Sequence, residues 1–66
     1  MTTTDVANAI GGWKKSNYGQ FPTFNDLLAI LGGDPHDLRD ELEKAEQVQA
    51  INEPSPGHYD VVPGML

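Results

Sequence analysis

Apolar residues recur three and four positions apart in the first part of the chain, which is the spacing of one face of an α-helix. The first such stripe consists of Val6, Ala9, Ile10 and Trp13. It predicts an amphipathic helix with a threonine before Asp5 as its N-cap. Gly11 and Gly12 lie within this stripe. Because glycine costs about 1 kcal/mol relative to alanine inside a helix, we expect the helix to bend or fray there.

Two shorter stripes follow, separated by a Gly-Gly-Asp turn. They consist of Phe24, Leu27, Leu28 and Leu31, and of Leu38, Leu42 and Ala45. Thr23 and Asp26 approximate a capping box at the start of the second helix. The glycine pair at 32–33 predicts the end of that helix, and the Asp-Pro pair at 34–35 predicts the start of the third. Two helices joined by so tight a turn form a helix-turn-helix layout.

After the third helix the pattern changes to two short strand-like runs. Val48, Ala50 and Ile51 belong to the first run, and residues 58–62 form the second, which the Pro-Gly pair at 63–64 ends. The Pro-Ser-Pro-Gly segment at 54–57 predicts the turn between them. The sequence therefore predicts a single α+β domain over residues 1–66. Its three helices followed by a two-stranded hairpin correspond to a winged helix-turn-helix.

Aromatic and apolar residues lie in two further places. Four aromatic residues surround the first loop: Trp13, Tyr18, Phe21 and Phe24. We expect them in the core, with Tyr18 at its rim, rather than stacked on nucleic-acid bases. The apolar tail, residues 61–66, either folds back over the domain or forms an edge that pairs with another chain, so a homodimer stays open.

Charge changes this picture more than any other property. Ten Asp and Glu residues against four Lys and Arg give a formal net charge of −6. The third predicted helix holds many of the acids, among them Asp37, Asp40, Glu41 and Glu43. With the apolar stripe facing inward, we expect these four on the exposed face or its flanks. Lys44 follows Asp40 by four residues, and Glu43 follows Arg39 by four, so both basic side chains are predicted to pair with acids.

Several classes of function find no support in the composition. The chain has no cysteine and two histidines, and the Asp-Pro-His-Asp segment at 34–37 offers too few ligands for a metal site. No serine has the context of an activated nucleophile, and no glycine-rich loop suits a phosphate. We therefore expect no enzyme, no cofactor and no metal. In the absence of a signal-peptide pattern or a membrane-length apolar run, the sequence favours a cytoplasmic protein without membrane contact.

Two segments resemble a known family. Residues 22–32, Pro-Thr-Phe-Asn-Asp-Leu-Leu-Ala-Ile-Leu-Gly, resemble the second helix of GntR-type and related bacterial winged-helix repressors. Residues 38–42 together with Ala45 resemble their recognition helix, and Ala50-Ile51 the start of their first wing strand. The resemblance covers residues 22–62 and implies a winged-helix fold with a third helix in the DNA major groove. Gln49 stands where the family often has glycine, and the helix that corresponds to the recognition helix is acidic.

Two functional hypotheses follow. In the first, a small regulatory or inhibitory protein uses Asp37, Asp40, Glu41 and Glu43 to bind a basic surface on a protein partner. Its carboxylates would stand in for phosphates, as in a DNA mimic of the kind that phages and mobile elements encode. The alternative is a DNA-binding transcriptional regulator. Its candidate contacts to duplex DNA are Lys14, Lys15, His36, Arg39, Lys44 and His58. A solvated acidic helix face without a ligand remains a third interpretation.

Overall fold

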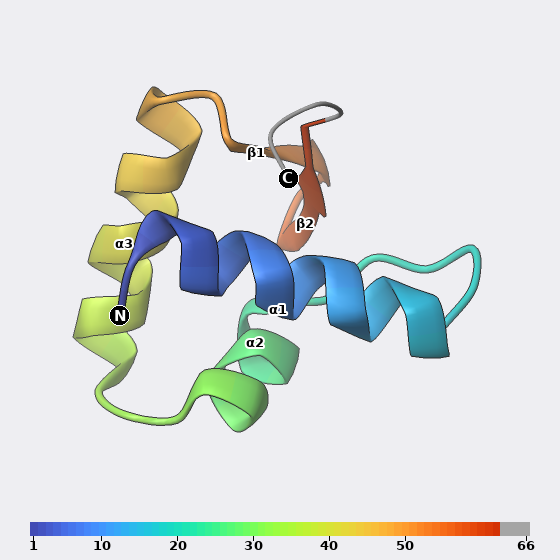
Figure 1. The fold of residues 1–66 in the computed structure, drawn as a ribbon, viewed down its shortest axis with the longest axis horizontal. Helices are drawn as coiled ribbons and strands as arrows, with labels where there is room; N and C mark the ends of the chain where they lie inside the picture. The colour runs from blue at the N-terminus through green and yellow to red at the C-terminus, as the bar shows by residue number, and fades with distance from the viewer. Residues whose placement is uncertain (63–66) are drawn as a thin grey trace.

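Three helices and a C-terminal hairpin make up the computed structural model, which describes residues 1–62 (Figure 1). The elements are α1 (Thr3–Ser16), α2 (Phe24–Leu31), α3 (Pro35–Gln47), β1 (Ile51–Ser55) and β2 (His58–Val61). Helix α1 contacts α2, α3 and β2, whereas β1 packs against β2 and α3. The predicted α+β order of three helices and a two-stranded antiparallel hairpin is confirmed.

Both α1 and α2 begin with a complete capping box. The hydroxyl of Thr2 accepts from the backbone N–H of Asp5 at 3.2 Å, and the Asp5 carboxylate accepts from the backbone N–H of Thr2 at 3.0 Å. Thr23 and Asp26 repeat this arrangement at 3.3 and 3.0 Å. Each box satisfies backbone donors that a helix start leaves without partners, and each puts a carboxylate at the positive end of the helix dipole.

Helix α1 runs without a break through its two glycines, so the expected bend or fraying at Gly11 and Gly12 is wrong. Val6 and Ile10 on the inner side of the helix are fully buried. Burial of side chains of this size contributes about 1.5–3 kcal/mol each, which outweighs the cost of the two glycines.

The turn into α3 depends on two glycines that adopt positive φ angles. Gly32 has φ 71° and Gly33 has φ 81°, and the N–H of Gly32 donates to the carbonyl of Leu28 at 2.7 Å. Asp34 then caps α3, because its carboxylate accepts from the N–H of His36 at 2.8 Å. The predicted end of the second helix and start of the third are confirmed.

The end of α3 is a Schellman motif built with glutamine in place of glycine. Gln49 adopts φ 61°, its N–H donates to the carbonyl of Glu46 at 3.0 Å, and the N–H of Ala50 donates to that of Ala45 at 2.9 Å. Ala45 and Ala50 are both buried, which gives the motif its apolar contact. Val48 is the C-cap of α3, so its predicted place in a strand-like run is wrong.

The hairpin pairs Ile51 with Val61 and Ser55 with His58, with an irregularity between Asn52 and Ser55. Its strands extend further toward the turn than predicted, because residues 54–55 belong to β1 and only residues 56–57 form the turn. The backbone before α2 joins the hairpin: the N–H of Tyr59 donates to the carbonyl of Pro22 at 2.9 Å. The predicted Pro-Gly end of the second strand, like most of the apolar tail, lies outside the described residues.

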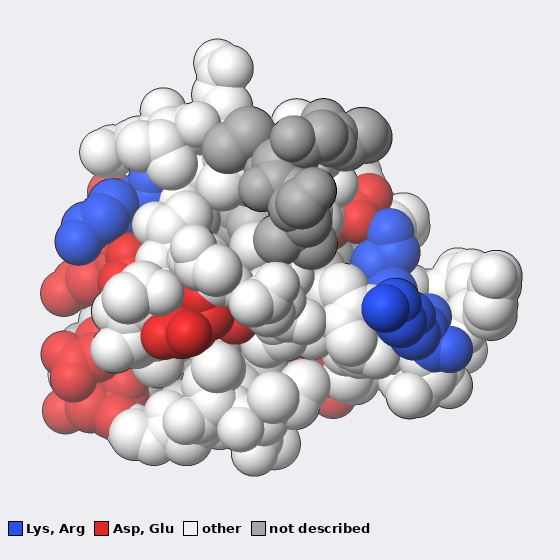
Figure 2. All heavy atoms as spheres, viewed as in Figure 1, with Lys and Arg blue, Asp and Glu red and all other residues white. Residues whose placement is uncertain are grey.

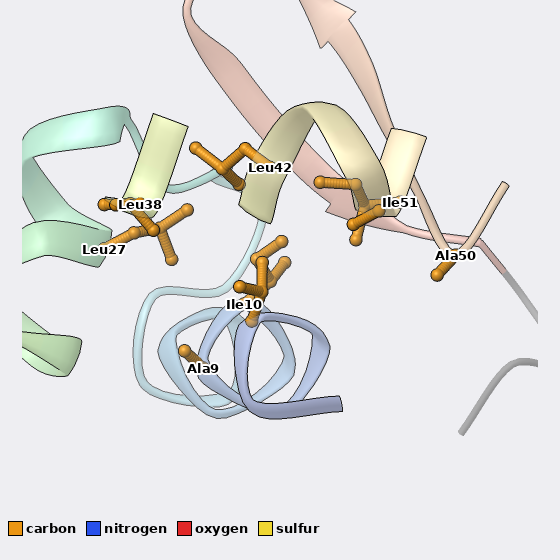
Figure 3. Close-up of a cluster of buried hydrophobic side chains, with 9 residues drawn as sticks. Ala9, Ile10, Leu27, Leu38, Leu42, Ala50 and Ile51 are labelled. Carbon is orange, nitrogen blue, oxygen red and sulfur yellow. The ribbon is translucent and has the colours of Figure 1, made fainter. Parts of the chain in front are cut away.

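The core is aliphatic. Its buried members are Val6, Ala9, Ile10, Leu27, Leu38, Leu42, Ala45, Ala50 and Ile51, several of which point toward one another in Figure 3. The expected aromatic core is wrong for most of its members. Phe24 is partly buried against the cluster, Trp13 and Phe21 are half-buried, and Tyr18 is 94% exposed. Phe24 and Tyr59 pack against this aliphatic cluster while remaining partly exposed.

Candidate functional site

Acidic residues gather on the side of the molecule that α3 forms, as the red atoms on the left of Figure 2 show. Asp37, Asp40 and Glu43 are all exposed along this helix, where the sequence predicted them. They turn away from Leu38 and Leu42, which are buried in the core. We call these three residues the α3 acidic face.

Glu41, the fourth predicted member, does not belong to this exposed face. It is only 8% exposed, and its Oε2 accepts no hydrogen bond within residues 1–62. The reason is its position: it follows Leu38 by three residues and precedes Ala45 by four, and both are fully buried. The ammonium of Lys44 lies 3.8 Å from Oε2 and partly compensates this buried charge.

The two cations of α3 also differ from the expected pairs. Arg39 places its guanidinium carbon 5.7 Å from the ring centroid of Phe24, and Lys44 lies beside Glu41. Neither the Lys44–Asp40 nor the Arg39–Glu43 pair forms in the described part of the chain. The carboxylates of Asp40 and Glu43 are therefore not neutralised by the cations that the sequence places near them.

A groove lies between α3 and the hairpin, with a volume of about 510 Å³. It is lined by Phe24, Arg39, Leu42, Glu43, Glu46, Glu53 and Tyr59. We call it the α3–hairpin groove. Burial raises the pKa of the Tyr59 hydroxyl, and the charges of Glu53 and Glu46 raise this pKa further, whereas Arg39 lowers it. The field at the Tyr59 hydroxyl is therefore dominated by carboxylates.

Sequence reasoning did not find this groove. Glu53 and Tyr59 come from the hairpin and Phe24 from the start of α2, so no local spacing connects them with α3. The Glu53 carboxylate is held in place because it accepts from the N–H of Gly57 at 2.6 Å.

The C-terminal end of α1, on the far side of the molecule from α3, carries the basic residues Lys14 and Lys15. The blue atoms on the right of Figure 2 lie at this end of the helix. The Lys14 ammonium lies 2.5 Å from a carboxylate oxygen of Asp60 and 5.2 Å from the ring centroid of Phe21. Lys15 and Tyr18 are exposed nearby. A hollow of about 590 Å³ lies between this end of α1, the following loop and β2.

The candidate DNA contacts are thus divided between separate parts of the molecule. His36, Arg39 and Lys44 lie along α3 and are exposed. His58 begins β2, with its Nδ1 3.2 Å from the carbonyl of Pro56. Lys14 and Lys15 lie at the far end of α1, so the structure does not combine the six residues into one basic surface.

Residues 1–62 contain no group of three or more His, Asp or Glu side chains placed to hold a metal ion. No helix in the same range has the length and apolar character to cross a membrane. Compared with protein-family models, curated proteins and solved structures, the chain matches none of them.

Proposed function

We propose that this chain is a winged helix-turn-helix protein that binds a basic surface of a protein partner through the α3 acidic face. The element order and the contact between residue 22 and β2 support the fold assignment, since they place the hairpin beside the helix-turn-helix. One observation carries the functional proposal. Asp37, Asp40 and Glu43 are exposed, while the neighbouring cations Arg39 and Lys44 lie against Phe24 and Glu41 of the same chain.

Exposed carboxylates on one helix produce a negative potential that attracts and orients a basic partner. Protein sites that bind nucleic acid are rich in Lys and Arg because they contact phosphates. A helix that displays carboxylates is complementary to the same sites. The partner class is therefore a protein whose basic surface ordinarily faces a nucleic acid.

Two variants with the same net charge test this proposal. Asp40→Asn with Glu43→Gln removes two negative charges from the face, and Asn8→Lys with Gln20→Lys adds two positive charges at exposed positions elsewhere. The probe is a fluorescein-labelled twelve-residue Lys/Arg peptide, titrated by anisotropy at about 50 mM salt, where electrostatic attraction is strong. We expect the neutralised face to lose about tenfold in affinity and the control about twofold or less. Equal losses would show that only net charge matters and would contradict the proposal.

A DNA-binding regulator is the second candidate, favoured by the exposure of Arg39 and Lys44 on a helix beside the hairpin. Labelled duplex DNA replaces the peptide in the same titration. If DNA is the target, Asp40→Lys with Glu43→Lys tightens binding and steepens its salt dependence. If a basic protein is the target, wild-type chain leaves the DNA anisotropy unchanged and the same variant no longer binds the peptide.

A further inference from the structure

We propose that the α3–hairpin groove binds an arginine side chain of the protein partner. This inference rests on the proposed function, because it names the side chain that the partner inserts beside the α3 acidic face. The groove, the carboxylates and the aromatic rings that carry it come from three elements and the start of a fourth.

The groove is large enough to take a side chain. Its volume of about 510 Å³ is that of a small-ligand cleft, so one long side chain fits in it. The rings of Phe24 and Tyr59 line the groove on the α2 and hairpin sides and supply its apolar surface. An aliphatic stem can lie along such surface while its charged end meets the carboxylates.

The carboxylates select a cation. Glu43 and Glu46 lie one helical turn apart on α3, and Glu53 faces them from β1. None of the three forms an ion pair within residues 1–62. Glu53 is preorganised by the N–H of Gly57.

The rings favour arginine over lysine. The chain's own Arg39 lies over the Phe24 ring at 5.7 Å. The ring on which a partner guanidinium would stack is therefore that of Tyr59, the other aromatic residue that lines the groove. A guanidinium is planar, stacks on aromatic faces and presents several N–H donors in a fixed fork. An ammonium offers one compact charge and gains less from the rings.

Two peptides of equal charge test this assignment on the full chain. One alternates Arg with Gly over eight residues, the other alternates Lys with Gly, and both are acetylated and amidated. Affinities come from anisotropy, and the binding site comes from amide shifts in ¹H–¹⁵N spectra. We expect the Arg peptide to bind about three- to fivefold more tightly, with shifts at Phe24, Glu53 and Tyr59.

Two matched variants separate the groove from the rest of α3. Glu46→Gln with Glu53→Gln removes two charges from the groove, retains an acceptor for Gly57 and abolishes the preference for Arg. Asp37→Asn with Asp40→Asn removes two charges outside the groove, weakens both peptides alike and retains the preference. Preserved amide spectra of the unliganded variants establish that both are folded.

The results distinguish a failure of the groove proposal from a failure of the acidic-face proposal. If both peptides bind equally and shift residues 37–43 but not the hairpin, the groove proposal is overturned and the acidic face stands. If neither peptide binds at low salt, both proposals are overturned. If Glu46→Gln with Glu53→Gln leaves the Arg preference intact, the selectivity arises elsewhere and the groove is not the site.

Discussion

The α3 side of the molecule and the far end of α1 use their charged residues in opposite ways. On α3, the carboxylates of Asp37 and Asp40 are exposed, and the cations lie against groups of the same chain. At the end of α1 the acid Asp60 is engaged by Lys14, and the exposed charge is that of Lys15. Figure 2 shows most red atoms on the α3 side, with some blue atoms beside them, and further blue atoms at the far end of α1.

This difference shows that the acidic face does not simply follow from an excess of acids. Three of the four cations contact an acid or an aromatic ring of their own chain. Because Arg39 lies over Phe24 and Lys44 lies beside Glu41, no ion pair neutralises Asp37, Asp40 or Glu43 within residues 1–62. Such an arrangement repels the phosphates of DNA from α3.

The largest expected effect is a loss of stability that affects the α3 side and the end of α1 together. Ile10 is fully buried in α1, which packs against α3 and β2, whereas Ile30 on α2 is 50% exposed. We expect Ile10→Ala to reduce the free energy of unfolding by about 3 kcal/mol and Ile30→Ala by less than about 1 kcal/mol. Urea denaturation followed by circular dichroism measures both. Similar losses would mean that α1 is not the element that holds the two regions together.

Glycine-to-alanine substitutions should destabilise the protein at the turn into α3 and stabilise it within α1. Gly32 has φ 71° at the turn into α3, whereas Gly12 lies inside α1, and a Cβ at either position meets nothing within 4 Å. Backbone conformation therefore decides the outcome. Gly32→Ala should cost about 1–3 kcal/mol, and Gly12→Ala should stabilise by about 1 kcal/mol. Thermal unfolding of both variants gives the signs, and a stabilising Gly32→Ala would rule out this turn geometry.

Local signals predicted the helices well. The capping threonines, the glycine pair at 32–33 and the Asp-Pro start of α3 act within a few residues, so their effect can be inferred from sequence alone. The end of α3 was predicted less well, because Gln49 adopts a left-handed conformation that usually indicates glycine. The strand-like run at Val48 was consequently placed too early.

The candidate site could be predicted only where it lies on a single helix. Asp37, Asp40 and Glu43 follow from helical periodicity, but the burial of Glu41 depends on which flank of α3 the other elements cover. The groove requires the hairpin to dock beside α3, and the Lys14–Asp60 pair joins residues 46 positions apart. Contacts of this kind depend on tertiary packing, which no local pattern in the chain specifies.

A smaller effect compares the two ion pairs directly. Lys14 and Asp60 are hydrogen-bonded at 2.5 Å, whereas Lys44 lies 3.8 Å from Glu41 without a hydrogen bond. Double-mutant cycles with Lys14→Met and Asp60→Asn should give a coupling of about 1 kcal/mol. Cycles with Lys44→Met and Glu41→Gln should give about 0.3 kcal/mol. A stronger coupling for the α3 pair would reverse the contrast between the two regions.

The smallest expected effect is a pH dependence that reports the field of the α3–hairpin groove. The pKa of Tyr59 is raised above its ordinary value of 10.0, first by burial and then by Glu53 and Glu46. A raised pKa of the folded state means that this contribution to stability is present below the unfolded pKa and is lost as the pH rises through the folded pKa. The chain has two tyrosines, so in a Tyr18→Phe background ultraviolet absorbance titrates Tyr59 alone.

In that background, Glu46→Gln with Glu53→Gln should move the Tyr59 pKa toward its ordinary value without fully restoring it, because burial remains. Asp37→Asn with Asp40→Asn should move it less, since neither residue lines the groove. An equal response to both pairs would mean that Tyr59 senses the charge of the whole α3 side. The groove would then have no field of its own, and its carboxylates would offer a partner arginine nothing that the rest of the acidic helix does not.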